Sequence, residues 1–220
     1  MRELSDLRFL DGRTLRVGKI VCLGGTYSQH NKEMKRDDLP RPLLFLKPST
    51  AIIHNGDAIE VLPFSSSLHY EVELVAVIGK EGKRISEKDA MKFICGYAVG
   101  LDMTLRDLQD VAKKKGHPWS IAKGFDTSAP ISDAVPAQTV SNPHDLDIQL
   151  KVNGKIRQKS RTSKMIFPLE YQVAYISSIF KLEEGDLIFT GTPEGVGQVT
   201  SGDTLEGYIE KVGGITVKVG

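Results

Sequence analysis

Short apolar stretches with strand character are spread along the whole chain, and helical patterns are few. The clearest pattern is a hairpin over residues 145–160, in which apolar and polar residues alternate around Asn153-Gly154, a pair typical of a type I′ turn. Other apolar runs that end at glycine, proline or acidic residues are predicted as strands. They cover residues 19–25, 43–48, 71–79 and 97–103, and with tight turns residues 185–193 and 202–219.

Helical periodicity is confined to four segments, most of which carry recognisable end signals. They are residues 27–34 and 86–96, with Ser28 and Ser86 as N-caps, residues 104–116, from Thr104 to Gly116, and residues 168–180, opened by Pro168. Strands outnumber these helices, and the two do not alternate regularly. The pattern therefore favours an α+β fold that is mainly β, a mixed β-sandwich, over a regular βαβ array.

The chain divides into a short beginning and one large remainder. Residues 1–18 are predicted as a short N-terminal extension with a hairpin that turns at Asp11-Gly12. Residues 19–220 contain no internal repeat, low-complexity segment or long linker. We therefore expect them to form one domain, since a length near 200 residues can bury a sizeable core.

Composition and charge exclude several classes of protein. The 220 residues are 40% hydrophobic and 26% charged, with a net charge of +1, so no nucleic-acid partner is indicated. No apolar run approaches the roughly 18 residues of a membrane span, and the charged N-terminus has no apolar signal core. Cys22 and Cys95 form no CxxC motif. We expect free thiols, no thiolate zinc site and a cytoplasmic location.

The apolar run EVELVAVIG, residues 71–79, contains two glutamates that need an explanation. Glu71 and Glu73 are two apart, so both side chains point to the same face of a strand. Two like charges near a core are costly unless they are neutralised. They lie either in water on an edge strand or on a hard cation such as Mg²⁺, Mn²⁺ or Ca²⁺. For a cation, Asp102 at the end of the apolar run 97–103 is the best third ligand.

Further polar residues fit either a site or the surface. Arg106 and Gln109 share one helix face, where an arginine can bind a carboxylate by two parallel hydrogen bonds, but an exposed face would also contain them. Lys123 lies in SIAKGFD, whose apolar flanks make a surface position less expected. His30 and Glu33 are three apart on one short helix. A carboxylate that orients a histidine makes a general base, whereas a lone histidine on a helix is more often simply exposed.

The glycine-rich segment GTPEGVG, residues 191–197, follows a predicted strand. It lacks the Gly-Lys-Ser/Thr ending of a P-loop and no helix is predicted after it, so a nucleotide site is not expected. Two interpretations stay open. The segment either offers backbone N–H groups and the Thr192 hydroxyl to a small anion, or it is a plain β-turn.

Four segments of the sequence together resemble the fumarylacetoacetate hydrolase family, from about residue 19 to the C-terminus. They are LLFLKPST, HYEVELVAVIG, GLDMTLRDLQDVAKKKGHPWSIAKGFD and GDLIFTGTPEGVG. The third segment is long and very specific, and the similarity is greatest to the acylpyruvate hydrolase and oxaloacetate decarboxylase branch. The resemblance implies a mixed β-sandwich roll over residues 19–220, the catalytic domain, in a protein that is usually a homodimer.

The resemblance also implies a role for each residue singled out above. Glu71, Glu73 and Asp102 match the family's Mg²⁺ or Mn²⁺ ligands. The positions that match those holding the keto-acid end of the substrate are Arg106, Gln109, Lys123 and Thr192. His30 and Glu33 match a dyad on a lid helix that closes over the site. The carboxylate pair would then be neutralised by a divalent cation.

The activity implied is hydrolysis of the C–C bond of an acylpyruvate to pyruvate and a carboxylic acid. A 2-oxo acid can chelate the cation, which then acts as a Lewis acid. Glu33 would orient His30 to activate a water, while Lys123 and Gln109 stabilise the developing oxyanion. Cleavage of the C–C bond would leave a pyruvate enolate held on the cation. Decarboxylation of oxaloacetate passes through the same enolate but does not need the water. One site could therefore run both reactions.

The sequence departs from the family pattern before the lid histidine. Relatives in this branch often read Gly, then Arg, Lys or Leu, then Asn-Tyr, whereas this chain has Gly25 and Thr26 at the middle positions, and Gly124 where serine is frequent. Gly25 would loosen the lid or widen the pocket, so the substrate stays open. The alternatives are an isomerase or decarboxylase of 2-oxo-dienoic acids and, more remotely, a non-catalytic protein that binds 2-oxo acids.

Overall fold

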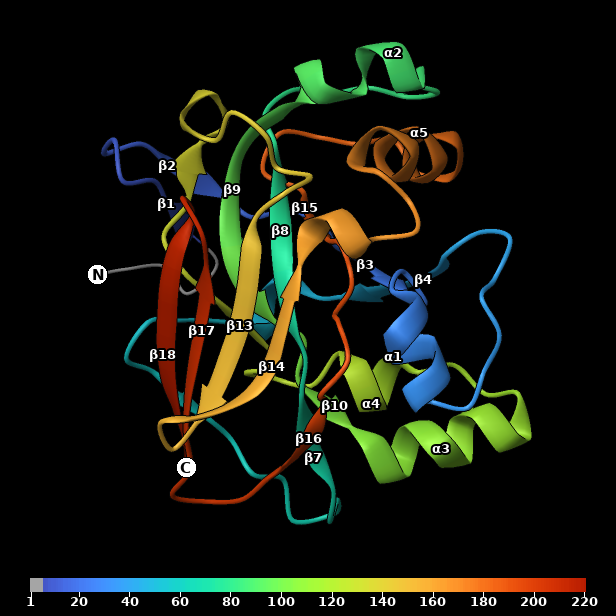
Figure 1. The fold of residues 1–220 in the computed structure, drawn as a ribbon, viewed down its shortest axis with the longest axis vertical. Helices are drawn as coiled ribbons and strands as arrows, with labels where there is room; N and C mark the ends of the chain where they lie inside the picture. The colour runs from blue at the N-terminus through green and yellow to red at the C-terminus, as the bar shows by residue number, and fades with distance from the viewer. Residues whose placement is uncertain (1–5) are drawn as a thin grey trace.

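The protein is built around two facing β-sheets, seen in a computed structural model that describes residues 6–220 (Figure 1). The larger sheet is mixed, because β3 and β15, and β11 and β5, run parallel while its other pairs are antiparallel. Its order is β4 (Leu43–Lys47), β3 (Ile20–Gly24), β15 (Leu187–Phe189), β8 (Val72–Ile78), β9 (Ile94–Leu101), β11 (Ala129–Ile131) and β5 (Ile52–His54), with β12 (Val135–Pro136) also paired to β9.

The second sheet lies over β8 and β9 and completes the sandwich (Figure 1). Its order is β14 (Lys155–Arg161), β13 (Asp147–Val152), β17 (Thr204–Ile209), β18 (Gly213–Val219) and β6 (Ala58–Ile59). Two small sheets join β10 (Thr104–Leu105), β7 (Leu68–Tyr70) and β16 (Gly197–Val199), and β1 (Asp6–Arg8) with β2 (Thr14–Arg16). The predicted mixed β-sandwich roll is confirmed.

The helices are short and lie around the sheets. The α-helices are α1 (Ser28–Glu33), α2 (Glu87–Ala90), α3 (Arg106–Lys115), α4 (Ser120–Lys123) and α5 (Leu169–Ile179). Single 3₁₀ turns cover Ser49–Ala51, Met91–Phe93, Ala137–Thr139 and Thr162–Lys164. Helices α1, α3 and α4 gather beside one end of β8, while α2 and α5 lie near its other end (Figure 1).

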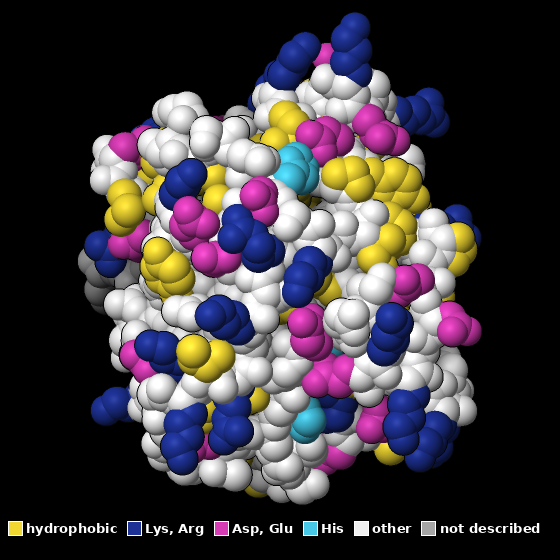
Figure 2. All heavy atoms as spheres, viewed as in Figure 1, with side chains coloured by type: hydrophobic (Ala, Val, Ile, Leu, Met, Phe, Trp, Pro, Cys, Tyr) yellow, Lys and Arg dark blue, Asp and Glu magenta, His cyan; other side chains and the backbone are white. Residues whose placement is uncertain are grey.

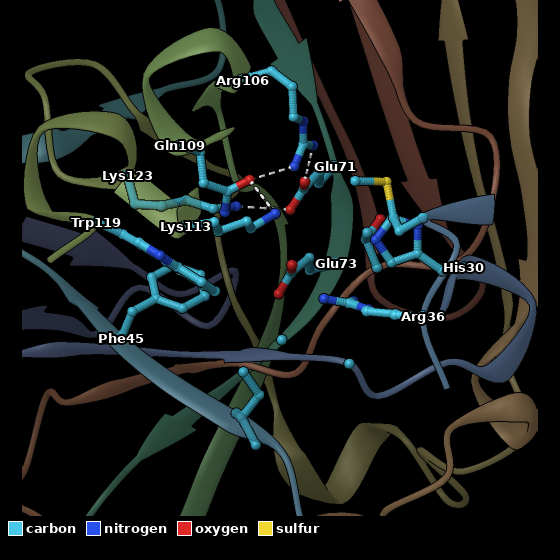
Figure 3. A pocket seen from close by; sticks show the side chains of 15 residues that line it. His30, Arg36, Phe45, Glu71, Glu73, Arg106, Gln109, Lys113, Trp119 and Lys123 are labelled. Atoms are coloured by element: carbon cyan, nitrogen blue, oxygen red, sulfur yellow. Dashed lines mark hydrogen bonds and ion pairs between the residues drawn. The ribbon is translucent and has the colours of Figure 1, made fainter. Parts of the chain in front are cut away.

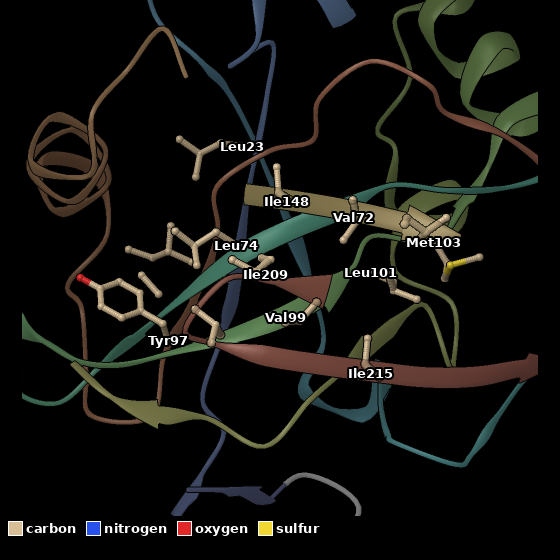
Figure 4. Packing of buried hydrophobic residues seen from close by; sticks show 14 of the residues in the cluster. Leu23, Val72, Leu74, Tyr97, Val99, Leu101, Met103, Ile148, Ile209 and Ile215 are labelled. Carbon is tan, nitrogen blue, oxygen red and sulfur yellow. The ribbon is translucent and has the colours of Figure 1, made fainter. Parts of the chain in front are cut away.

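Strand β8 separates two apolar clusters by simple alternation. Val72 and Leu74 point into the sandwich, where they belong to one cluster with Ile148 of β13 and Ile209 of β17 (Figure 4). Each such side chain stabilises the fold by about 1.5–3 kcal/mol when fully buried. Val75 points to the opposite face of the sheet and joins a second buried cluster. Residues 71 and 73 are in phase with Val75, so the two glutamates lie on that second face.

The N-terminal hairpin covers part of this second face. Its strands β1 and β2 are antiparallel, and the predicted turn at Asp11-Gly12 is confirmed, with Gly12 at φ +91°. Leu7 and Phe9 are buried in the second cluster. Residues 6–18 thus pack on the larger sheet, whereas residues 1–5 of the predicted extension lie outside the described residues. The boundary between extension and domain stays a prediction.

The predicted strand runs and the 145–160 hairpin are confirmed. Two predicted helix starts are wrong, and a third, at Ser86, is right in position but lacks the capping hydrogen bond. Ser28 lies inside α1, and its hydroxyl donates to Asp38 at 2.5 Å instead of capping the helix. Thr104 belongs to β10, so α3 begins only at Arg106. Ser86 holds the N-cap position of α2, yet its hydroxyl donates to a side-chain carboxylate. In each case a nearby polar partner competes for the capping oxygen.

Two helix ends also illustrate local and non-local control. The predicted end of α3 at Gly116 is confirmed, because Gly116 adopts the left-handed conformation at φ +66°. The predicted helix 86–96 is too long, since residues 94–96 belong to β9. Pairing with β8 outweighs helix propensity there, because it satisfies the same backbone groups while burying Ile94.

The surface carries no field of one sign on the face shown in Figure 2, where basic and acidic side chains are interspersed. Hydrophobic side chains gather there over α5. That helix and the turn before it carry stacked rings of Phe167, Tyr171 and Tyr175, with centroids 5.3 and 6.0 Å apart. Among residues 6–220, no helix is long and apolar enough to cross a membrane.

Candidate active site

The ends of β8 and β9 place three carboxylates side by side. Asp102 directly follows β9, and its backbone N–H donates to the Glu71 carbonyl at 2.8 Å. Glu73 lies opposite Gly100 in the same ladder. Oxygens of Glu71, Glu73 and Asp102 lie within 4.8 Å of one another, and all three side chains are buried. The structure thus brings the three predicted ligands together, away from solvent. We call this group of carboxylates the sheet wall.

Two buried lysines partly neutralise the sheet wall. Lys123 of α4 places its Nζ 2.9 Å from Glu71 Oε2 and 2.6 Å from Asp102 Oδ2. Lys47 of β4 places its Nζ 2.8 Å from Asp102 Oδ1, and it also donates to the Met103 carbonyl at 3.2 Å. Burial by itself would lower the pKa of Lys123. The negative charges of Asp102 and Glu71 have the larger combined effect and raise that pKa. The expectation that Lys123 is buried is confirmed.

The two glutamates differ in how well they are compensated. Burial works to raise the pKa of Glu71, but Lys123 and Arg106 outweigh it and hold that pKa well below its usual range. Burial, followed by the charges of Asp102 and Glu71, raises the pKa of Glu73 well above its usual range. Of the two glutamates, Glu73 is therefore the one with a raised pKa, and the cations of the described residues do not offset its burial.

This arrangement fits a divalent cation. The Gly191 N–H donates to Glu73 Oε2 at 2.7 Å. Buried carboxylates without enough positive charge are strongly unfavourable, and additional cationic charge would relieve this cost. The donor set contains only carboxylate oxygens, which Mg²⁺ and Mn²⁺ prefer. Glu71, Glu73 and Asp102 are thus the residues that would hold such an ion.

Helix α3 adds a second layer of polar groups. Arg106 donates from Nη2 to Glu71 Oε1 and from Nη1 to Gln109 Oε1, the latter at 2.7 Å. Lys113, one turn further along, donates to the same Gln109 oxygen at 3.0 Å. Arg106 and Gln109 are buried, so the exposed-face interpretation of this pair is wrong. Both residues line the pocket.

The opposite side of the pocket comes from α1. His30 is buried, and its Nδ1 lies 3.0 Å from Glu33 Oε2. This contact leaves Nε2 as the ring nitrogen available to a substrate. Burial lowers the pKa of His30, against the opposing influence of Glu71 and Glu33, so the imidazole is neutral near pH 7. We call His30, Glu33 and Arg36, which follows α1, the lid wall.

The glycine-rich segment binds two carboxylates of the protein itself. Gly191 donates to Glu73, and the Gly195 N–H donates to Glu33 Oε1 at 3.0 Å and Oε2 at 3.3 Å. Both glycines have φ near +95°, and a Cβ at either would lie within 2.2 Å of a neighbouring atom. The segment is therefore more than a plain turn, because it links the sheet wall to the lid wall.

Thr192 lines the pocket, but its hydroxyl is engaged inside the protein. Thr192 Oγ1 donates to the Val72 carbonyl at 2.8 Å and accepts from Gln158 Nε2 at 2.8 Å. The oxygen of Gln158 accepts from the Val72 N–H at 3.0 Å. A role for Thr192 in holding substrate stays a prediction, while its structural role is to fix the start of β8.

One pocket is lined by many of these groups (Figure 3), although Asp102, Lys47 and Glu33 are not among its lining residues. Glu71, Glu73, Arg106, Gln109 and Lys123 face it from the sheet and α3–α4 side, and His30 and Arg36 face it from the lid. Phe45 and Trp119, with ring centroids 5.8 Å apart, form an aromatic side. The pocket therefore combines acidic, basic and aromatic surfaces within reach of a small molecule.

Several of these residues were not singled out by the sequence patterns. Lys47 lies in the apolar run LLFLKP, the same kind of signal that identified Lys123. Gln158 alternates with solvated residues on β14, and nothing local distinguishes it. Arg36 lies in a charged loop and Lys113 in a lysine run, where solvation is the usual state. Phe45 and Trp119 look like ordinary core residues in the sequence.

Comparison with known proteins decides the family. Residues 19–220 match the profile of the fumarylacetoacetate (FAA) hydrolase C-terminal domain. The chain belongs to the fumarylacetoacetate hydrolase family. A relative from Rattus norvegicus, named oxaloacetate tautomerase FAHD1, mitochondrial, is 48% identical over 200 residues, which cover 91% of this chain and 90% of the relative.

Solved structures of the fumarylacetoacetate hydrolase family share the fold. The fumarylpyruvate hydrolase from Pseudomonas aeruginosa, crystallised with Mn²⁺ and pyruvate, superposes with a TM-score of 0.95 at 39% identity, covering 100% of this chain and 97% of that one. The 5-carboxymethyl-2-hydroxymuconate delta-isomerase from Mycobacterium smegmatis superposes with a TM-score of 0.83 at 35% identity, covering 94% and 85%. Within this family, similar chains thus include a tautomerase, a hydrolase and an isomerase.

Proposed function

We propose that this protein is a divalent-cation-dependent enzyme that acts on small 2-oxo acids through their enolates, and that it tautomerises oxaloacetate. The observation that carries this proposal is a buried three-carboxylate cluster, two of whose members, Glu71 and Glu73, line one pocket together with His30, whose Nδ1 contacts Glu33. The similarity to a relative named oxaloacetate tautomerase supports the choice of substrate. Mg²⁺ and Mn²⁺ are the proposed ions, as hard cations suited to the carboxylate set.

The residues of the pocket suit the movement of a proton between oxygen and carbon. A bound divalent cation would supply Lewis-acid stabilisation of negative charge on the 2-oxo oxygen. Arg106 and Gln109 would bind the adjacent carboxylate, and the Lys123 ammonium would add positive charge beside it. His30, oriented by Glu33, would take the enol O–H proton on Nε2 and return a proton to the adjacent carbon. The net change is isomerisation, with no atoms lost.

The proposal is tested by mixing chelator-stripped protein with enolic oxaloacetate and following the decay of enol absorbance, with and without added Mg²⁺ or Mn²⁺. We expect cation-dependent acceleration over the spontaneous rate. Pyruvate formation, measured in parallel, separates tautomerisation from decarboxylation. No acceleration by the cation-loaded protein would contradict the proposal.

A second candidate is the hydrolysis of acylpyruvates, which the His30–Glu33 contact favours. A neutral histidine held by a carboxylate can activate a water as well as an enol. Attack on the distal carbonyl would break the C–C bond, and its electron pair would enter the pyruvate enolate before protonation. Pyruvate release from acetylpyruvate checks this candidate, and His30→Ala should abolish it. An isomerase of 2-oxo-dienoic acids would instead leave acetylpyruvate intact.

We also propose that the protein is a homodimer, as expected from the resemblance. The larger sheet ends at β4, whose Leu43 and Leu46 are exposed, and Val111 and Ile121 are exposed on the neighbouring α3 and α4. Exposed apolar residues on an edge strand favour association. Light scattering coupled to gel filtration measures the mass. The cytoplasmic location stays a prediction.

A further inference from the structure

Two cationic side chains of the pocket are not paired with the carboxylates of the sheet wall. Arg36 and Lys113 both line the pocket, yet neither forms an ion pair with a carboxylate of the described residues. Of the other two lining cations, Arg106 pairs with Glu71, and Lys123 pairs with Glu71 and Asp102. Arg36 and Lys113 therefore favour a ligand that carries a negative group besides its keto-acid carboxylate.

Arg36 is held in place by a built network. Its backbone N–H donates to the Asn31 carbonyl at 2.9 Å, and its side-chain Nε donates to Asn31 Oδ1 at 2.9 Å. Asn31 is completely buried and is itself fixed, since its amide donates to Asp38 Oδ1 at 2.7 Å and to the Gly25 carbonyl at 3.2 Å. With Nε occupied, the two Nη groups stay available to another partner.

Gly25 leaves the space that the guanidinium uses. A Cβ at this position would lie 3.9 Å from Arg36 Nη2 and 3.7 Å from Asn31 Oδ1. Any longer side chain at residue 25 would therefore compete with Arg36 for the same part of the pocket. Figure 3 shows the Arg36 side chain reaching from the lid wall towards the side of Glu71 and Glu73.

Lys113 faces the same region from α3. Its ammonium donates to Gln109 Oε1 at 3.0 Å and lies 5.4 Å from the centre of the Trp119 ring. Partial burial, followed by Arg106 and with a contribution from Arg36, lowers the pKa of Lys113, against Asp110 and Glu71. Lys113 and Arg36 line the same pocket, Lys113 from α3 and Arg36 from the lid wall. An anion between them would relieve the repulsion.

We propose that Arg36 and Lys113 form a subsite for the second carboxylate of a 2-oxo dicarboxylate. The keto-acid end would occupy the region of Arg106, Gln109 and Lys123, and the distal carboxylate would be bound by the free Nη groups and the ammonium. This inference deepens the proposed function and rests on it for the reaction. On this proposal, Arg36 determines the preference for dicarboxylate substrates over acylpyruvates with an apolar tail.

The kinetic test compares oxaloacetate with acetylpyruvate, which carries a methyl ketone where oxaloacetate has its second carboxylate. For Arg36→Gln we expect kcat/KM for oxaloacetate to fall roughly 10–100-fold, mainly through KM, because one charged hydrogen-bonded contact is lost. Turnover of acetylpyruvate should change by less than about threefold. Arg36→Lys, which keeps the charge, should recover part of the loss. An equal fall for both substrates would overturn the proposal, since Arg36 would then act only on the buried carboxylates.

A binding test separates failure of the subsite from failure of the proposed reaction. The probes are 2-oxoglutarate and 2-oxopentanoate, which have the same chain length but two carboxylates and one, titrated calorimetrically into the Mn²⁺-loaded protein. We expect the wild type to bind the dicarboxylate roughly 10-fold tighter or more, and Arg36→Gln and Lys113→Gln to reduce that preference. A preference without oxaloacetate turnover would keep the subsite and reject the reaction. Turnover without any preference would reject the subsite.

Matched controls come from neighbouring residues of the same charge. Lys35→Gln removes a cation next to Arg36, and Lys114→Gln removes one next to Lys113, and both side chains are exposed outside the pocket lining. Both controls should keep the dicarboxylate preference within about twofold. If the controls lost the dicarboxylate preference equally, the effect would come from net charge alone, and the assignment to Arg36 and Lys113 would be overturned.

Discussion

The two walls of the pocket are positioned by different kinds of interaction. On the sheet wall, Glu71 and Asp102 are joined through their backbones at the ends of β8 and β9, and ladder hydrogen bonds set the spacing. On the lid wall, His30 and Arg36 come from the six-residue α1 and the loop behind it, where no side chain caps the helix. Contacts from Asn31 and Gly195 hold that segment instead.

The two walls therefore face different physical problems: like charges are buried together on the sheet wall, and side chains must be held in position on the lid wall. The sheet wall needs no extra residues to place its carboxylates, but it concentrates like charge in a buried region and depends on lysines to offset it. The lid wall carries little buried charge, yet its geometry depends on individual side-chain hydrogen bonds. Substitutions on the sheet wall should therefore change cation binding and charge balance. On the lid wall, Asn31 and Arg36 should affect position and affinity, while His30 carries the proposed proton transfer.

The largest effect is expected from Glu73→Gln. The amide keeps the size and can still accept from Gly191, while it removes a cation ligand and one buried negative charge. Activity should fall roughly 1,000-fold or more, because Lewis-acid stabilisation contributes several kcal/mol. In the absence of metal, the free energy of unfolding should stay equal or rise, since like-charge repulsion decreases. Urea denaturation with chelator, together with activity assays, measures both; a marked loss of stability would contradict this account.

A large loss of stability is expected from Lys47→Met. Lys47 is buried, and its ammonium lies 2.8 Å from Asp102 Oδ1, so the substitution leaves a buried carboxylate without this partner. We expect unfolding to become easier by about 3–5 kcal/mol in the metal-free protein. Lys92→Met is the matched control, because its ion pair with Asp89 is exposed and should contribute less than about 1 kcal/mol. Equal losses of unfolding free energy in the two variants would contradict the distinction between a buried and an exposed ion pair.

A smaller, position-dependent effect is expected from Asn31→Ala on the lid wall. The substitution removes the hydrogen bonds to Arg36, Asp38 and Gly25, at a cost of about 1–3 kcal/mol for the buried groups left without partners. KM for oxaloacetate should rise together with this loss, because the guanidinium is no longer directed. Cation affinity, measured by Mn²⁺ titration, should not change. A fall in cation affinity would show that the two walls are not independent.

The smallest effect is a shift in the pH profile of His30. Burial lowers the pKa of His30, while Glu71 and Glu33 raise it, so the neutral, basic form persists below the ordinary histidine range. Activity should therefore be lost only as the pH falls through this lowered value. Glu33→Gln removes one of the opposing charges and should move the acid limb of kcat/KM to still lower pH, by less than about one unit. A shift to higher pH would contradict the sign.

Local pattern was sufficient for a definite part of this molecule. Period-two alternation placed Glu71 and Glu73 on one face, Asn153-Gly154 set a hairpin turn with both residues at positive φ, and Gly116 ended a helix. Each of these depends on backbone geometry within a few residues, which the side chains report directly. The resemblance to a known family added the ligand set and the lid dyad, which spacing alone left open.

The tertiary structure decided what depends on distant partners. Ser28 and Thr104 have the composition of N-caps, but they bond to Asp38 and to the Asp102 carbonyl, respectively. Lys47 and Arg36 look like ordinary loop or strand residues until Asp102 and Asn31 are placed beside them. A hydrogen-bond donor or charge takes the partner that burial brings near, and burial depends on how strands far apart in the chain pair.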